Sequence, residues 1–426
     1  MSLKSVSRTS VPDAFTMLPA ERKAAGWLAS IYALRMFGMF MILPVFSLHA
    51  AGLPGGDNLS LIGLAMGIYG LAQACMQIPL GWASDKIGRK PIIIGGLLLF
   101  AAGCWLGYVA ETVEQLVWAR ALQGAGAISA ALSALLADVT RDEVRSKGMA
   151  MIGASIGITF ALSLVCAPVL YKFFGLSGLF GITGVLSILG IGVVIWLLPT
   201  PNLADQQAKL QGSFADGWAV LTQTDLLRLN LGIFTLHLTQ MSLFVVVPSL
   251  LLSGLGLPLE EHWKVYLPVV LGSFVLMVPL MVWAEKKAKT KQVKLGSIAL
   301  MAVVLLGLVL LADQGWVVVL LLLAYFVGFN LLEATLPSWV SRVAPLSHRG
   351  LALGVYNTSQ ALGLFAGGAL GGLAFRHLGA QGVFEGVLLL VVLWFLLAMG
   401  IKALPPRATT VQPGNSDSNT ASTSPT

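Results

Sequence analysis

Two long apolar runs are joined by the short charged stretch GWASDKIGRK, residues Gly81–Lys90. The flanking runs, Leu61–Trp82 and Pro91–Ala110, are each about 20 residues long, enough for a helix to cross the hydrocarbon core of a bilayer. Gly81 allows two helices to approach closely, and Gly88 can adopt a backbone conformation that residues with a Cβ avoid. We therefore predict a tight turn between two membrane spans.

The composition places the chain among membrane proteins. Hydrophobic residues make up 57% and charged residues 11% of the sequence, with a mean hydropathy of +0.85, whereas roughly a quarter of residues are charged in soluble domains. The chain is basic, but its positive charge is spread over short loops, which argues against a nucleic-acid partner. Cys75, Cys104 and Cys166 all lie in apolar runs without metal-ligand spacing, so we expect no metal site and no disulfide.

The apolar runs predict an all-α membrane protein with twelve transmembrane helices in two six-helix halves. The runs cover about 24–51, 60–82, 91–110, 114–138, 148–171, 177–199, 227–254, 263–284, 294–312, 315–341, 350–375 and 381–402. The expected organisation is a cytoplasmic tail (1–23), an N-terminal half (24–199), a cytoplasmic linker (200–225), a C-terminal half (226–402) and a disordered cytoplasmic tail (403–426).

Orientation follows from lysine and arginine, because loops rich in these residues stay in the cytoplasm. If both termini are cytoplasmic, the cytoplasmic segments hold 21 of the 26 lysines and arginines, and the opposite loops hold only Lys172, Lys264 and Arg376. The other two, Arg35 and Arg120, lie inside apolar runs. We therefore predict that both termini are cytoplasmic.

The two halves also resemble copies of one another. Three segments of the first half recur in order 200 to 204 residues later, namely Gly38–Pro44 as Ser242–Pro248, Ile78–Leu80 as Val278–Leu280, and Lys147–Met151 as Arg349–Leu353. Weak internal symmetry of this kind is typical of transporters built from two related halves.

The turn and two further segments carry a family resemblance. The pattern G-x3-D-x2-G-R-K resembles the loop signature of the major facilitator superfamily, and Arg120–Gly126 (RALQGAG) is similar to the fourth-helix motif of its proton-driven antiporters. From about Leu18 to Leu404 the chain resembles the YajR-type branch of drug-efflux carriers, most clearly at 34–36, 262–267 and 329–334. That branch commonly carries a soluble C-terminal domain, whereas this sequence ends in a short tail.

The resemblance implies roles for the turn and for several glycines. The implied conformational latch consists of Gly81, Asp85, Gly88, Arg89, Lys90 and Asp138. In it, Asp85 faces the N-terminus of the eleventh span near Ser347–Gly350, and Arg89 pairs with Asp138. Close helix packing is expected at Gly124, Gly126, Gly363, Gly367 and Gly371, the last three at four-residue spacing.

Polar residues inside the apolar runs are the candidates for the central cavity, because charges in hydrocarbon are costly and usually mark function. They are Arg35, Arg120, His237 and Glu333, joined by Asn330, which shares a helix face with Glu333. In the superfamily, the first helices of the four three-helix repeats line the cavity, and the four titratable residues lie on those helices. Alternatives remain open: Arg35 and Arg120 could serve packing, and His237 could be a satisfied interior histidine.

Glu333 is the leading candidate for proton coupling, because it is the only acid deep in an apolar run. Apolar surroundings favour the neutral form of a carboxyl group and a neighbouring Arg favours the charged form, so the sequence leaves the balance open. One departure weakens the antiporter prediction. Small residues at Ala154, Ser163 and Ala167 stand where the fifth-span motif of the family has glycines.

The resulting prediction is a carrier of the bacterial inner membrane that exports a small, amphipathic solute in exchange for protons by alternating access. We expect a monomer in the lipid bilayer that needs no cofactor beyond the proton gradient. We expect no enzymatic activity, because the sequence has no nucleophile–base pair, metal-ligand cluster or nucleotide-binding loop. Two alternatives remain: a proton symporter or uniporter for nutrient uptake, and a non-transporting receptor or scaffold.

Overall fold

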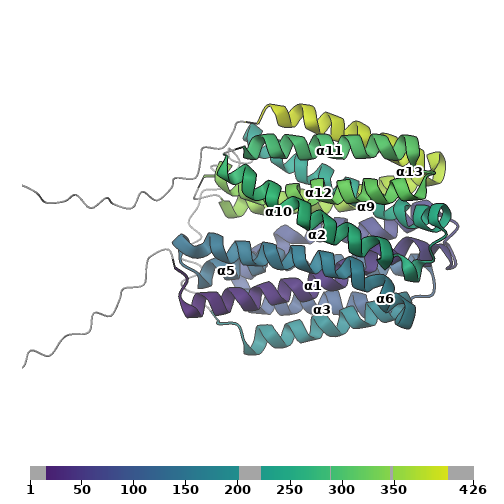
Figure 1. Cartoon of the computed structure of the whole chain (residues 1–426). Helices are drawn as coiled ribbons and strands as arrows, with labels where there is room; N and C mark the ends of the chain where they lie inside the picture. Colours follow the sequence, from purple (N-terminus) through teal and green to yellow (C-terminus); the bar gives the residue numbers. More distant parts are fainter. Residues whose placement is uncertain (1–15, 201–221, 288, 346–348, 402–426) are drawn as a thin grey trace, which may run out of the picture.

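The computed structural model describes residues 16–200, 222–287, 289–345 and 349–401, and within these ranges the side chains of 142, 143, 146, 285, 349 and 350 are left out. Most of the predicted N-terminal tail, the predicted C-terminal tail and most of the predicted linker therefore lie outside the described residues. What is described is a bundle of long helices that lie side by side with roughly parallel axes (Figure 1).

The helices of the N-terminal half are α1 (Pro19–Ala51), α2 (Leu59–Ile87), α3 (Arg89–Tyr108), α4 (Val113–Ala125), α5 (Ser129–Val139) and α6 (Asp142–Trp196). Those of the C-terminal half are α9 (Thr224–Leu255), the short 3-10 helix η1 (Leu259–Glu261), α10 (Trp263–Lys286), α11 (Thr290–Leu311), α12 (Gly315–Val343) and α13 (Arg349–Met399). Within the described residues, ten helices are long and apolar enough to cross a membrane, with α4 and α5 counted as one.

Two of these helices are interrupted by a glycine with a positive φ. In α6 the interruption is Gly175, with φ 62° and ψ −174°, and in α13 it is Gly379, with φ 69° and ψ −170°. Side chains with a Cβ rarely adopt such angles, so glycine is favoured at each interruption. Each interruption falls in a gap between predicted runs, at 171–177 and 375–381.

Several boundaries differ from the prediction: α2 continues to Ile87 rather than 82, and α6 begins at Asp142 rather than 148. Helix α1 begins at Pro19 rather than at 24, because proline suits the first helical position and the Glu21 carboxylate accepts a hydrogen bond from the Leu18 backbone nitrogen at 2.8 Å. The run predicted as one helix at 114–138 is broken between Ala125 and Ser129. A Cβ on Gly126 would overlap the Gly96 carbonyl oxygen, so the break lets α3 and this segment approach closely.

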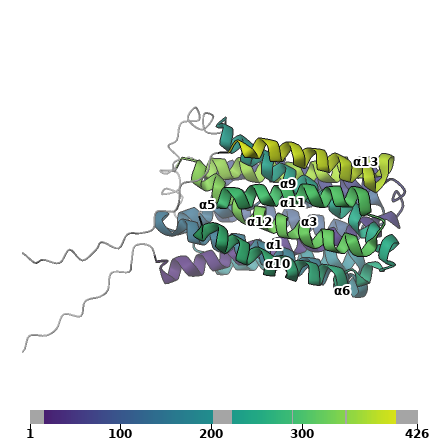
Figure 2. The same cartoon turned by 45° about the horizontal axis from the view of Figure 1, so that its top comes forward.

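The described chain begins and ends at the same end of the bundle, on the left in both views (Figures 1 and 2). Contacts join neighbouring segments at this end: Arg141 donates to Glu21 at 2.9 Å, and Arg228 donates to the Gly400 carbonyl at 2.6 Å. The N-terminal helices, purple to teal, occupy one side of the bundle, and the C-terminal helices, green to yellow, occupy the other. Helices that follow one another in the sequence therefore gather on the same side of the bundle, while the bounds of the two halves stay a prediction.

A glycine seam joins the halves toward the opposite end. We use this name for the contact of Gly63, Gly67 and Gly70 on α2 with residues 361–372 of α13. A Cβ on Gly63 would overlap the Gly368 carbonyl oxygen, and one on Gly70 would overlap the Ala361 carbonyl oxygen. Backbone-to-backbone contact of this kind needs small residues on both helices. Beyond the seam, Arg376 donates to Asn58 at 2.8 Å.

Candidate functional site

The charged turn between α2 and α3 is built around a buried arginine. Arg89 is 7% exposed and donates to Asp138 at 3.0 Å and to Ser84 Oγ at 2.9 Å, and it also pairs with Asp85. Gly88 has φ 107° and ψ 155°, a region essentially confined to glycine. The predicted Arg89–Asp138 pair and the special backbone at Gly88 are thus confirmed. The ion pairs and hydrogen bonds of Arg89 join α2, α3 and α5 at this turn.

The remaining residues of the turn have different outcomes. A Cβ on Gly81 would lie 3.4 Å from the Ala130 Cβ, which agrees with the close approach predicted there. Lys90 is partly exposed. The predicted contact of Asp85 with Ser347–Gly350 falls outside the described residues, so the latch stays a prediction.

A cationic cluster lies inside the N-terminal half, formed by Arg35 on α1 and Arg120 on α4 around Tyr69 of α2. Both arginines are 1% exposed. Arg35 donates to Tyr69 Oη at 2.7 Å, and the Arg120 guanidinium carbon lies 4.7 Å from the centre of the Tyr69 ring. Arg120 also donates to Gln123 at 2.9 Å, and Gln123 donates to Cys104 Sγ at 3.0 Å. The two predicted cavity arginines are therefore neighbours.

An acid–imidazole cluster lies in the C-terminal half, where Glu333 of α12 faces His237 of α9. Glu333 Oε2 lies 3.7 Å from His237 Nε2. Gln360 of α13 connects them, with its Nε2 3.5 Å from Glu333 Oε1 and 2.7 Å from His237 Nε2. His237 Nδ1 lies 3.2 Å from the Ile233 carbonyl oxygen, a partner that fits a neutral ring with its proton on Nδ1 and Nε2 accepting from Gln360. The Glu333 side chain is 31% exposed, but its Oε2 is buried and has no hydrogen-bond partner among the described residues.

Asn330 does not join this cluster, although it shares a helix with Glu333. It donates to Ser273 Oγ of α10 at 3.0 Å and is 8% exposed. Its position three residues before Glu333 leaves it rotated toward α10, while Glu333 faces α9 and α13. We therefore assign Asn330 to packing between α10 and α12.

Aromatic side chains connect the two clusters. Phe160 of α6 lies between the halves, 4.9 Å from Phe40 of α1 and 5.9 Å from Phe329 of α12, measured between ring centres. Phe329 in turn lies 5.9 Å from the His237 ring. On the other side, Phe40 packs against the core group that contains Tyr69. An apolar layer therefore extends from the cationic cluster to the acid–imidazole cluster.

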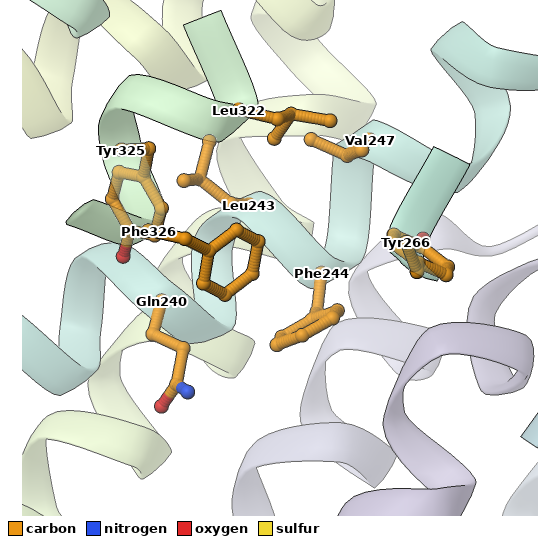
Figure 3. A pocket seen from close by; sticks show the side chains of 8 residues that line it. All are labelled: Gln240, Leu243, Phe244, Val247, Tyr266, Leu322, Tyr325 and Phe326. Atoms are coloured by element: carbon orange, nitrogen blue, oxygen red, sulfur yellow. The ribbon is translucent and has the colours of Figure 1, made fainter. Parts of the chain in front are cut away.

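A narrow pocket borders this layer within the C-terminal half, between α9, α10 and α12. It leaves room for about one water molecule. Figure 3 shows the residues that line it, Gln240, Leu243, Phe244, Val247, Tyr266, Leu322, Tyr325 and Phe326. The side-chain oxygens of Gln240, Tyr266 and Tyr325 are buried without a hydrogen-bond partner among the described residues, but the surface that faces the pocket is apolar.

The predicted packing glycines lie at close helix contacts. A Cβ on Gly124 would overlap the Tyr69 carbonyl oxygen of α2, and Gly363 and Gly367 meet the backbone of α9 in the same way. Gly371 makes a looser contact, because a Cβ there would lie 3.0 Å from Ser242 Oγ. These contacts hold the helices that carry the two clusters at fixed distances.

Gln360 and Tyr69 are the main site residues that the sequence analysis did not select. A buried glutamine or tyrosine costs less in an apolar run than a charge, so neither stands out by composition. Gln360 lies on the same helix as the selected Gly363 and Gly367, but its rotation toward α9 depends on how α13 packs.

Comparison with known proteins decides the family. The model of the Major Facilitator Superfamily matches residues 28–368 and 271–425. The chain belongs to the major facilitator superfamily. This family member is 43% identical over 394 residues to the inner membrane transport protein YajR of Escherichia coli K12, a match that covers 92% of this chain and 86% of YajR. It is 24% identical to the multidrug resistance protein MdtH of Aeromonas salmonicida, over 86% of this chain and 91% of MdtH.

Solved structures agree with this assignment at the level of the fold. The human organic anion transporter MFSD10 (TETRAN) matches with a TM-score of 0.66 and 19% identity, over 89% of this chain and all of that one. A point mutant of the nucleoside transporter NupG matches with a TM-score of 0.66 and 14% identity, over 88% of this chain and 98% of that one. The expected family resemblance is thus confirmed, and this chain is a multi-pass membrane transporter.

Proposed function

We propose that this chain is a secondary active transporter of the bacterial inner membrane that exports a small, amphipathic solute in exchange for protons. The observation that carries the proposal is the acid–imidazole cluster, a partly exposed acid in the middle of the bundle that lies within hydrogen-bonding distance of Gln360. The names of the relatives YajR and MdtH support transport across the inner membrane and drug efflux.

The proposal includes twelve crossings with both termini in the cytoplasm. The apolar parts of α6 and α13 contain 50 and 49 residues, and a continuous helix of that length would measure about 75 Å, more than twice the hydrocarbon thickness. Reversal at Gly175 and Gly379 converts each into two crossings, and ten helices then give twelve spans. The lysine and arginine distribution supports the orientation.

The proposed mechanism is alternating access between the two halves. The glycine seam closes the end of the bundle that holds Asn58, which becomes the periplasmic end in this orientation. The charged turn lies at the other end, where Asp85 and Arg89 act as the latch for the opposite state. The solute binds in the middle, between the cationic cluster and the acid–imidazole cluster.

Glu333 carries the proton in this mechanism. A carboxyl group binds or releases a proton with little rearrangement, and Gln360 and His237 Nε2 offer partners for both of its forms. Arg35, Arg120 and His237 complete the cavity. Glu333→Gln keeps the size and hydrogen bonding of the side chain but holds it neutral.

The test uses everted membrane vesicles from cells that produce this chain, with a panel of fluorescent or radiolabelled amphipathic cations, neutral compounds and anions. At least one compound should accumulate in response to a pH gradient, and a protonophore or Glu333→Gln should abolish accumulation. Downhill exchange of labelled for unlabelled compound should survive in Glu333→Gln. Asp313→Asn, which changes an acid in the loop between α11 and α12, is the control and should behave as wild type.

Other outcomes identify the competing functions. Movement of a compound that stops at equal concentrations on both sides and is insensitive to the protonophore and to Glu333→Gln would indicate a uniporter. Movement of a compound across the vesicle membrane in the same direction as the protons would indicate a symporter for uptake. Absence of transport for every compound in the panel would favour a receptor or scaffold.

A further inference from the structure

The cationic cluster has two charges and no acid to neutralise them. In the six apolar runs of the N-terminal half, the only acids are Glu114 and Asp138, which lie at the two ends of the fourth run. Arg35 and Arg120 lie in the middle of their helices and make no ion pair among the described residues. The interior of this half is therefore positively charged.

Several polar atoms of this cluster are also left without partners. Arg35 Nε and Nη1 and Arg120 Nε are buried and have no hydrogen-bond partner in the described structure. Three guanidinium nitrogens of the cluster thus lack an acceptor among the described residues.

The cluster is too costly to be explained by packing alone. Removing an arginine from water without a counter-charge costs several kcal/mol, and two such groups in one half roughly double this desolvation cost. The Tyr69 ring offers about 1–2 kcal/mol of cation–π attraction to each guanidinium, which offsets only part of the cost. A packing role would be met more cheaply by an uncharged side chain.

The side chains around the cluster indicate which further chemical groups a ligand would have. Met36 and Phe40 pack against the core group formed by Met39, Tyr69, Phe100 and Cys104. Phe40 contacts Phe160, and Phe160 contacts Phe329, so the apolar layer extends into the C-terminal half. Methionine and aromatic side chains adapt to apolar groups of varied shape. A ligand that fits here has a negatively charged head and an apolar body.

We propose that Arg35 and Arg120 form the binding site for the oxyanion head of an amphipathic organic anion, whose apolar body lies against Phe40 and Phe160. Guanidinium groups bind carboxylates and phosphates through paired hydrogen bonds, and the free nitrogens of Arg35 can make such a pair. Gln73 of α2, which accepts from Arg35 at 3.5 Å, provides a further amide contact. This names the substrate class of the proposed carrier and so rests on the transport function proposed above.

Binding can be measured without transport. The full chain is reconstituted in nanodiscs of zwitterionic phosphatidylcholine, and 1-naphthoate is titrated by calorimetry, with 1-naphthalenemethanol and 1-naphthylmethylamine as neutral and cationic analogues. Wild-type protein should bind naphthoate at least tenfold more tightly than either analogue. Arg35→Gln and Arg120→Gln should each weaken naphthoate binding at least tenfold. Arg228→Gln, a change at the end of the bundle, should leave it unaltered.

Lysine variants keep the test decisive if the glutamine variants fail to fold. Arg35→Lys and Arg120→Lys preserve the charge but lose the planar fork, so naphthoate binding should be weaker than in wild type and stronger than in any folded glutamine variant. Unchanged affinity in all four variants would overturn the proposal, and so would equal binding of the three analogues or no binding of naphthoate. Such a result with pH-driven accumulation of other compounds intact would leave the transport function standing.

Discussion

Gln360 connects Glu333 and His237 through contacts of its side-chain amide. Its amide lies within hydrogen-bonding distance of both, so it orients the carboxylate and holds the imidazole tautomer. Gln360→Leu removes these bonds at similar volume. Because a hydrogen bond to a charged group contributes about 1.5–3 kcal/mol, pH-driven accumulation in everted vesicles should fall at least tenfold.

Gln381→Leu is the matched control for this change. Gln381 also donates to a glutamate, Glu385 at 3.0 Å, but on an exposed surface of the same helix. Its loss should leave accumulation unaltered. Equal activity of Gln360→Leu and wild type would show that Glu333 works without this connection.

The sequence predicted some residues of the site and not others, for a physical reason. The Arg89–Asp138 pair was implied by the family resemblance, and the conformation of Gly88 follows from the local sequence of the turn. Charges in apolar runs are conspicuous because they are costly. Gln360, Tyr69 and the partner of Asn330 depend on the rotation of whole helices. Helix rotation is set by packing between distant segments, which one sequence does not specify.

At the scale of elements, α13 packs through two different glycine faces. Gly363 and Gly367 meet α9 in the same half, while Gly368 and Gly372 meet α2 across the glycine seam. A single helix thus belongs to the C-terminal half and also closes the end of the bundle that holds Asn58. Motion of the halves must separate the second face while it preserves the first.

This arrangement predicts a difference between glycines of one helix. Gly367→Ala forces α13 away from the Leu238 backbone and should lower the free energy of unfolding by about 1–3 kcal/mol, the usual cost of overpacking. Gly354→Ala places its Cβ in open space on the same helix and should be neutral or slightly stabilising. Thermal unfolding of the purified proteins in detergent measures both. Equal melting temperatures would contradict the close packing.

Helix boundaries were predictable where glycine and polarity coincide. Gaps between apolar runs predicted the breaks at Gly175 and Gly379. The break after Ala125 was missed, because residues 126–128 are apolar or small and the run continues through them. Only the approach of α3, through Gly96 and Gly126, accounts for it.

At the scale of the whole molecule, the proposed orientation makes a direct prediction. A reporter fused after Lys291 should be active as a cytoplasmic protein, and one inserted between Leu53 and Asn58 should be active as a periplasmic protein. The reason is the excess of lysine and arginine on one side. The reverse pair of activities would overturn both the orientation and the assignment of the glycine seam to the periplasmic end.

The two halves could be predicted from the sequence repeats, but their contact could not. The repeats describe each half alone, whereas the seam of α2 and α13 is formed between them by Gly63, Gly67 and Gly70, which no motif singled out. Alternating access requires this seam to open as the opposite end closes.

The central claim is that the protonation of Glu333 selects between two arrangements of the halves. Spin labels at Trp82→Cys on α2 and Leu351→Cys on α13 report it, because both side chains are exposed near the end of the bundle opposite the seam. Cys75→Ala and Cys166→Ala remove the two cysteines that are not fully buried. Double electron–electron resonance in nanodiscs then measures the distance between the labels.

The distance distribution of the otherwise wild-type protein should contain two populations whose ratio changes between mildly acidic and mildly alkaline pH. In Glu333→Gln, which imitates the protonated acid, the distribution should match that of the acidic sample at every pH. A wild-type distribution that does not change with pH would contradict the account, and so would a Glu333→Gln protein that follows pH as the wild type does.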